Sequence, residues 1–285
     1  MVPFRKILFP VDYSAPCEAV IPYVKDMARR FSANVTLVHA YGPEPLAHSA
    51  LPITDPDLPE EARRFEQQRL REYALDRFPG QHVDTLAKLG EAGTVLHEFV
   101  QQQGTDVVML ATHGRGPVRR FLLGSVAAKV LHDVSAAVWT GTGAILTDHT
   151  SNIPYKSILC ALDDSEEAEG VLRVAASLAP SYEAQLSLVR LVQMPPPTAE
   201  LDFSPYKKDI MNAADDGLRA LKEKVGIDAP HAVVEATVAD GIREEAMRRK
   251  ADLIIIGRGR AQSTLRMWSH VYPVVRESPC PVLSL

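Results

Sequence analysis

The segment LATHGRGPVRRFLLGSVAAKV, at residues 110–130, combines residue types that bind phosphate through the backbone. His113-Gly114 ends an apolar run, nine residues separate Gly114 from Gly124, and Gly124-Ser125 opens a helical pattern. Glycines let backbone N–H groups approach a phosphate closely, and the first turn of a helix offers unpaired donors and a favourable dipole. The segment therefore predicts a phosphate-binding loop in which Ser125 adds a hydroxyl donor.

A purely structural explanation of the same residues stays open. Gly124-Ser125 can be a turn in which Ser125 caps the following helix, a device worth about 1 kcal/mol. Arg115, Arg119 and Arg120 add positive charge nearby, but the sequence does not say which of them face a ligand. Short glycine motifs are weak when taken alone, so the place of this one in the fold decides its meaning.

The strands and helices that would position this loop occur twice along the chain. The first pair of matching segments, FRKILFPVDYS and YKSILCALDDS, shares a short apolar run that ends in Asp, one residue and Ser. Three segments of the first half return in the same order in the second: 4–14 at 155–165, 35–41 at 186–192, and 105–116 at 251–260. Such self-similarity indicates a tandem repeat. We expect domains at 1–146 and 153–285.

Each copy alternates apolar strands with helical patterns, which is typical of a parallel sheet covered on both faces. With right-handed crossovers, this order predicts an α/β fold of two doubly wound, five-stranded parallel-sheet domains. Ligands bind such sheets beyond the carboxyl ends of the strands, where the strand order reverses. In the first copy these ends are Pro10–Asp12, Ala40–Tyr41 and Ala111–Ser125.

In this position the glycine pattern resembles that of the universal stress protein family, in its tandem two-domain form. Nucleotide-binding members of the family carry Gly, two residues, Gly, nine residues, Gly and then Ser or Thr, with an Asp after the first strand. Here the pattern reads Ala111-Thr112-His113-Gly114, residues 115–123 and Gly124-Ser125, and FPVDYS supplies Asp12. The resemblance covers both copies. It implies an adenine-nucleotide alpha-hydrolase-like fold whose two domains pair as a pseudo-dimer.

The resemblance also implies a role for each matching residue in binding ATP or a related adenine nucleotide, with Mg²⁺ as a further candidate. Asp12 is expected to contact the ribose or the adenine edge. The remaining residues of the expected site divide into those around the base, Pro10, Val11 and Ala40, and those at the phosphate loop, Ala111, His113, Gly114, Gly124, Ser125 and Val126.

Three of these residues have alternative interpretations. Asp12 can instead favour the dipole of the helix that begins near Ser14, and His113 can be a packing or hydrogen-bonding residue in a loop. Ala111 stands where the family has its first glycine. If that position needs a positive φ, alanine costs roughly 1 kcal/mol or more. If it needs only a small residue, the methyl group fits.

The second copy is predicted to have a degenerate loop. It keeps Asp163, Gly257 and Gly259, but no glycine follows Gly259. The register that should hold Gly-Ser reads Trp268-Ser269 or Ser269-His270, and a Trp there would fill the phosphate site, so we expect this site to be closed. The alternative is that this copy binds another small molecule through basic side chains: Arg258, Arg260 or His270.

Composition limits the remaining classes of function. The chain has 285 residues, 46% of them hydrophobic, and a net charge of −5, which gives no electrostatic reason to expect nucleic acid or an anionic membrane as a partner. The N-terminal apolar run is too short for a signal peptide. Three scattered cysteines without a CxxC pair argue against a disulfide framework or a zinc site and favour the cytoplasm.

Three functions fit these observations. The first is a stress-response protein whose first domain binds an adenine nucleotide as a regulatory ligand, as a homodimer of tandem chains with an unidentified protein partner. The second is a scaffold that binds no nucleotide because both sites have degenerated. The third is a slow ATP hydrolase, although no catalytic residue and no metal-binding set can be assigned from spacing.

Overall fold

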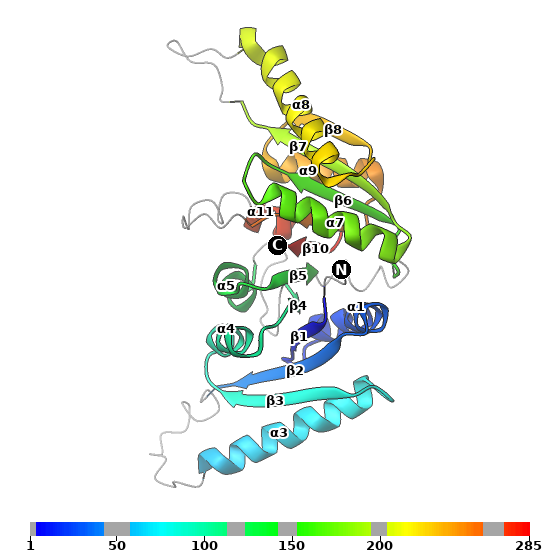
Figure 1. Ribbon diagram of the computed structural model, residues 1–285. Helices are drawn as coiled ribbons and strands as arrows, with labels where there is room; N and C mark the ends of the chain where they lie inside the picture. The colour runs from blue at the N-terminus through cyan, green and yellow to red at the C-terminus, as the bar shows by residue number, and fades with distance from the viewer. Residues whose placement is uncertain (1–3, 43–57, 113–122, 142–152, 195–203, 259–270) are drawn as a thin grey trace, which may run out of the picture. The chain divides into compact units, whose positions relative to one another are not determined.

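The computed structural model describes residues 4–42, 58–112, 123–141, 153–194, 204–258 and 271–285. The chain divides into two compact units, Val2–Ile153 and Pro154–Leu285. Each unit is a parallel sheet with helices on both faces (Figure 1). The predicted α/β class and the tandem repeat are therefore confirmed.

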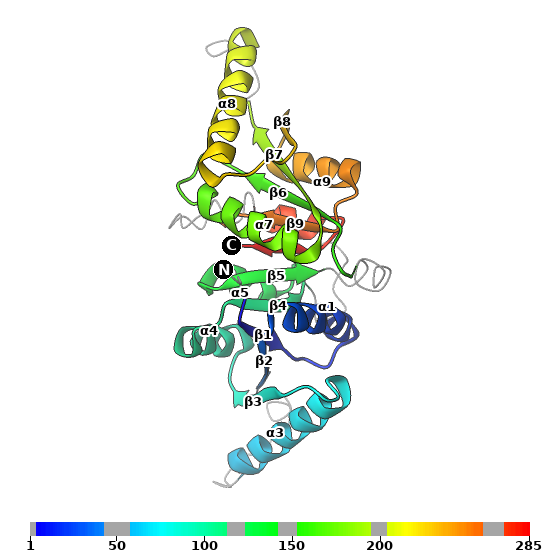
Figure 2. The same ribbon diagram turned by 45° about the vertical axis from the view of Figure 1, so that its right-hand side comes forward.

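The first unit alternates strand and helix throughout, and its sheet has the order β3-β2-β1-β4-β5 with parallel pairing. Helices α1 and α3 cover one face and α4 and α5 the other (Figure 2). The elements are β1 (Lys6–Pro10), α1 (Ala15–Phe31), β2 (Asn34–Tyr41), α3 (Leu58–Arg77), β3 (Val83–Leu89), α4 (Ala92–Gln103), β4 (Val107–Ala111), α5 (Ser125–Asp133) and β5 (Ala137–Gly141).

The second unit repeats this plan with the order β10-β9-β6-β7-β8. Helices α7 and α8 contact each other on one face, and α9 contacts α11 on the other. Its elements are β6 (Ser157–Leu162), α7 (Ala168–Tyr182), β7 (Gln185–Val192), the short η2 (Ser204–Tyr206), α8 (Lys207–Val225), β8 (His231–Glu235), α9 (Val238–Arg249), β9 (Leu253–Ile256), α11 (Tyr272–Glu277) and β10 (Val282–Ser284).

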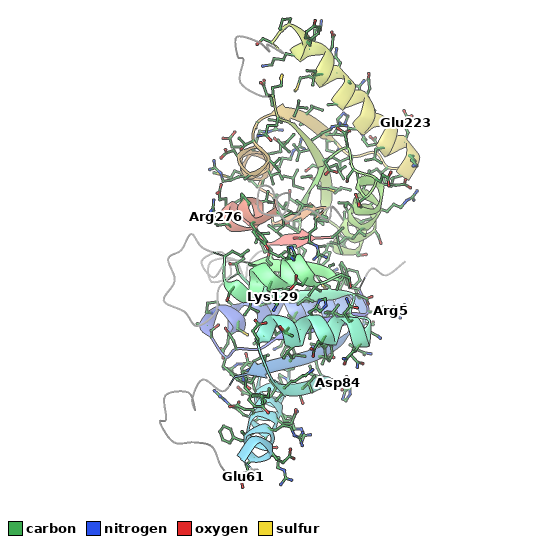
Figure 3. The ribbon with its side chains drawn as sticks, turned by 90° about the vertical axis from the view of Figure 1, so that its left-hand side faces the viewer. Arg5, Glu61, Asp84, Lys129, Glu223 and Arg276 are labelled. Atoms are coloured by element: carbon green, nitrogen blue, oxygen red, sulfur yellow. The ribbon has the colours of Figure 1, made fainter. Side chains whose placement is uncertain are left out.

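The central strands are apolar on both faces because helices cover both sides of each sheet. Leu8 and Phe9 in β1 are fully buried, as are Leu159 and Cys160 in β6. Charged side chains gather on the outer surfaces of the helices (Figure 3). Among the described residues, no helix is both long enough and apolar enough to cross a membrane.

A carboxylate clamp fixes the first strand beside the fourth in both units. In the first, Asp106 accepts hydrogen bonds from the backbone N–H groups of Arg5 at 2.7 Å and Lys6 at 2.8 Å. In the second, Asp252 accepts from Lys156 at 2.6 Å and Ser157 at 3.1 Å. Burial raises the pKa of Asp252 even though these two amides favour its ionised form.

We expect Asp252→Ala to lower the free energy of unfolding of the second unit by about 1–3 kcal/mol, because it leaves two backbone donors without their acceptor. Asp106→Ala is the matched control. It should cost less, because Asp252 is only 7% exposed whereas the bonds of Asp106 lie in an exposed environment. Hydrogen exchange at the amides of Lys156 and Ser157 measures the effect; unchanged protection in Asp252→Ala would contradict it.

Candidate functional site

The carboxyl edge of the first sheet brings the ends of β1 and β4 together. The two strands pair in parallel, with Ile7 beside Val107 and Leu8 beside Val108. Continuing this register places Val11 level with Ala111. The strand order reverses between β1 and β4, since β2 lies on the other side of β1. This edge is where a doubly wound sheet binds ligands.

The N-terminus of α5 is tied directly to this edge. The N–H of Gly124 donates to the carbonyl of Thr112 at 2.8 Å, and the N–H of Thr112 donates to Gly141 at 2.9 Å. The first-turn amides of Ser125, Val126 and Ala127 have no intrahelical partner by the geometry of a helix. Three unpaired backbone donors thus directly follow Gly124, whose hydrogen bond to Thr112 holds them at the end of β4.

Gly124, rather than Ser125, is the N-cap of α5. Gly124 has φ −63° and ψ 148°, and no side chain caps the helix. Ser125 is the first helical residue and is exposed. The interpretation of Ser125 as a capping residue is therefore wrong. Ser125 therefore belongs to the first turn of α5, whose amides have no intrahelical partner.

Asp12 contributes to the start of α1, which agrees with the alternative that it stabilises the helix beginning near Ser14. Its Oδ1 accepts the N–H of Ser14 at 2.9 Å, and the Ser14 hydroxyl in turn accepts the N–H of Cys17 at 3.2 Å and caps α1. Asp12 is half-buried. An ionised carboxylate has about four acceptor positions, so this turn orients Asp12 without using its full capacity.

Ala111 does not occupy a left-handed conformation. It is the last residue of β4, paired with Gly141, and it is not among the described residues with positive φ. Of the two alternatives for this position, the one that requires a positive φ is therefore wrong, and the one that requires only a small residue is supported. In the second unit the matching residue is Gly257, where an added Cβ would lie 3.2 Å from Val171 Cγ2. In the second unit this position is thus limited by space rather than by backbone conformation, and Ala111 adds one methyl group at the matching place in the first.

The other expected residues of the first site divide into two groups. Pro10, Val11 and Ala40 lie at the carboxyl ends of β1 and β2, where they were predicted. Two residues, His113 and Gly114, lie outside the described part of the chain, as do the arginines of the same loop: Arg115, Arg119 and Arg120.

An aromatic cluster behind the Asp12 turn was not predicted from the sequence. Tyr13 has φ 60°, a conformation that costs energy for a bulky residue. Its ring lies 4.8 Å from that of His39 and 5.2 Å from that of Tyr73, with the Arg69 guanidinium 4.1 Å above it. His39 Nδ1 lies 2.6 Å from the carbonyl of Val11. Contacts from β2 and α3 thus hold the Asp12 turn in place.

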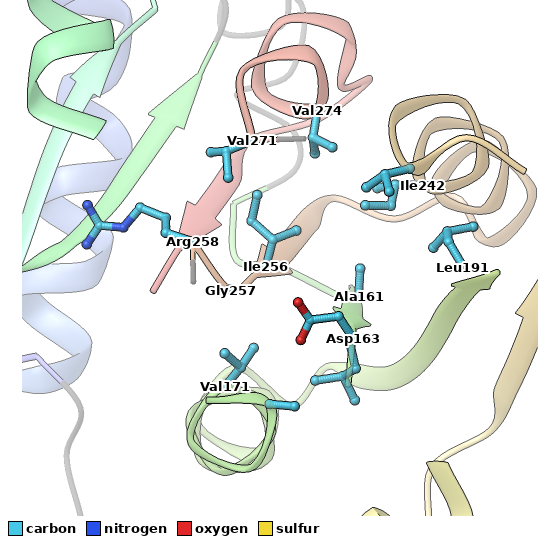
Figure 4. Close-up of a pocket in the computed structure, with 13 residues that line it drawn as sticks. Ala161, Asp163, Val171, Leu191, Ile242, Ile256, Gly257, Arg258, Val271 and Val274 are labelled. Carbon is cyan, nitrogen blue, oxygen red and sulfur yellow. The ribbon is translucent and has the colours of Figure 1, made fainter. Parts of the chain in front are cut away.

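A cavity of about 140 Å³ lies at the carboxyl edge of the second sheet (Figure 4). The residues expected to close the phosphate site, Trp268, Ser269 and His270, lie outside the described part of the chain, so that expectation stays a prediction. The lining comes from six elements (β6, α7, β7, α9, β9 and α11) and from residues that flank them: Ala161, Leu162, Asp163, Ala168, Val171, Leu191, Val238, Ile242, Ile256, Gly257, Arg258, Val271 and Val274.

Comparison with known proteins decides the family. The sequence model of the universal stress protein family matches residues 3–140 and again residues 154–285. The chain belongs to the universal stress protein family. A universal stress protein of Thermus aquaticus is 32% identical over 133 residues, which are 45% of this chain and 97% of that protein. One such protein thus matches about half of this tandem universal stress protein.

Solved structures share the fold of the whole chain. The crystal structure of a universal stress protein from Archaeoglobus fulgidus covers 100% of this chain and 97% of its own, with a TM-score of 0.70 and 18% identity. A functionally unknown protein from Pseudomonas aeruginosa covers 100% of this chain and 93% of its own, with a TM-score of 0.67 and 15% identity. At 15–18% sequence identity these two structures show a shared fold and nothing more.

We expect Cys17, which lies behind the Asp12 turn, to resist alkylation in the folded protein. Its Sγ lies 3.5 Å from the carbonyl of Pro10, and burial raises its pKa to about 12. The reactive thiolate is therefore nearly absent at pH 8. Burial also raises the pKa values of Cys160 and Cys280. Timed iodoacetamide labelling read by mass spectrometry should modify all three only after unfolding in urea; rapid labelling of native Cys17 would contradict this packing.

Proposed function

We propose that the first domain binds ATP or a related adenine nucleotide as a regulatory ligand. The observation that carries the proposal is the hydrogen bond from Gly124 N–H to the Thr112 carbonyl, which holds the first turn of α5 at the end of β4. Unpaired amides and the helix dipole at such a place favour an anionic group. Membership of the universal stress protein family supports the same ligand class.

In this proposal the nucleotide lies across the strand-order reversal. Its phosphates pass over the backbone of Gly124 and contact the amides of Ser125 and Val126, together with His113 and Gly114, and Mg²⁺ accompanies a triphosphate. The ribose lies at Asp12, whose orientation is set by its bond to Ser14. The base lies over the residues at the ends of β1, β2 and β4: Pro10, Val11, Ala40 and Ala111.

A signalling role fits this arrangement better than a catalytic one. The groups at the start of α5 are backbone amides and the Ser125 hydroxyl, which bind phosphate oxygens but are not tuned to remove a proton. We propose that binding changes the conformation or association of the chain, as a homodimer and with a protein partner, in the cytoplasm. Three buried free cysteines suit that reducing compartment.

The test replaces Gly124 with two residues of similar bulk and opposite effect on the helix. Asn is a favoured N-cap whereas Val is a poor one, and the backbone of Gly124, at φ −63°, accepts either residue. If phosphate must approach the backbone here, Gly124→Asn and Gly124→Val should both weaken ATP binding at least tenfold. Isothermal titration with Mg²⁺-ATP measures the affinity, and mass spectrometry of small molecules released from the purified protein identifies the bound nucleotide.

The outcomes separate the competing functions. Loss of binding in Gly124→Val alone would mean that only the integrity of α5 matters, and would overturn the phosphate assignment. An unaltered chain that releases no nucleotide and binds no Mg²⁺-ATP at millimolar concentration would favour the scaffold. Magnesium-dependent release of phosphate that both substitutions abolish would favour the hydrolase.

A further inference from the structure

The cavity of the second unit has walls that suit an apolar ligand. Its sides are side chains of Val171 from α7, Ile242 from α9, Ile256 from β9 and Val274 from α11, which converge on one space (Figure 4). Each of these four residues is at most 5% exposed. Removing apolar ligand surface from water against such walls is favourable.

The size of the cavity limits the ligand to a small group. An apolar cavity of about 150 Å³ accommodates one benzene molecule, and this one measures about 140 Å³. A single ring or a branched aliphatic group of similar volume therefore fits, whereas a purine with its sugar is larger than this volume. The volume thus favours a smaller ligand than the nucleotide proposed for the first domain.

A carboxylate lies at the mouth of the cavity. Asp163 follows β6, and its carboxylate is directed into the cavity (Figure 4). The backbone N–H and the hydroxyl of Ser165 both donate to its Oδ1, which fixes its orientation. The guanidinium of Arg258 points away from the cavity (Figure 4). A ligand that reaches this mouth meets an acceptor of hydrogen bonds, which favours a protonated amine.

Gly257 keeps the cavity accessible on the side of β9. A Cβ at this position would lie 3.2 Å from Val171 Cγ2, and the first unit has Ala111 at the matching place. The backbone of Gly257 lies outside the left-handed region that requires glycine. The residue therefore provides space rather than a special backbone conformation.

We propose that the second domain binds a small organic cation, with a single ring or branched aliphatic body in the cavity and its ammonium group at Asp163. The proposal does not depend on nucleotide binding by the first domain. It gives the two copies different ligands: an anion over α5 in the first, and a small cation at the carboxyl edge of β6 in the second.

Benzylamine is the probe, compared with neutral benzyl alcohol and with adenosine, using the full chain with ¹³C-labelled methyl groups. We expect benzylamine at millimolar concentration to shift the methyl signals of Val171, Ile256 and Val274 in a saturable manner. Benzyl alcohol should bind several-fold more weakly, and adenosine should leave these signals unchanged. Equal binding of adenosine would overturn the ligand class, and the absence of any benzylamine shift would overturn the site.

Two pairs of variants assign the effect. Gly257→Val fills the cavity and should weaken benzylamine at least tenfold, whereas Gly170→Val in α7, where an added Cβ meets nothing within 4 Å, should not. Asp163→Asn should weaken benzylamine about fivefold and leave benzyl alcohol unchanged, because an exposed ion pair contributes modestly. The control for Asp163→Asn is the matching substitution in the first domain, Asp12→Asn, which should leave benzylamine binding unchanged. Unaltered benzylamine affinity in both Gly257→Val and Asp163→Asn would contradict the proposal.

Discussion

The parallel pairing of the first strand with the fourth decides where the rest of each domain can act. Asp106 and Asp252 hold this pairing from its amino end through two backbone amides each. At the other end, the strand order reverses and the helices that leave the two strands pass to opposite faces of the sheet. The topology therefore sets the same place for a ligand in both copies, whatever residues line it.

From this shared frame the two copies have diverged at matching positions. In the first, Tyr13 and His39 are in contact through their rings behind the Asp12 turn. In the second, the residues at the same places are Asp164 and Arg190, which form an ion pair. Asp164 is largely exposed, so salt screens this pair, whereas the aromatic contact is insensitive to salt. The turn is thus kept by different chemistry in each copy, which allows the ligand to change while the fold does not.

Much of the fold follows from local sequence patterns. The apolar runs predicted at 35–41 and 186–192 are β2, Asn34–Tyr41, and β7, Gln185–Val192. Buried parallel strands are continuous apolar segments, so their sequence identifies them without tertiary information. The glycine spacing likewise identified the start of α5, because Gly-Ser directly before a helical pattern is a local signal of a helix start.

Other features depend on contacts that sequence spacing does not encode. The sequence left open whether Ala111 is strained and whether Ser125 caps α5, because φ and the exact cap depend on how β4 meets α5. The cluster around Tyr13 joins residues of β2 and α3 that are distant in the chain. The cavity of the second unit was not predicted from the sequence for a related reason. Its volume is what remains between side chains of several elements, and the absent Cβ of Gly257 is only one contribution.

The central claim is that the first-turn amides of α5, tied to the end of β4, form an anion site. An NMR titration of the full chain with Mg²⁺-ATP, following the amide signals of Ser125, Val126 and Ala127, tests it most directly. The account predicts that these amides shift in a saturable manner and more than those elsewhere in α5. If they remain unchanged at millimolar Mg²⁺-ATP, the start of α5 does not bind phosphate and the claim is contradicted.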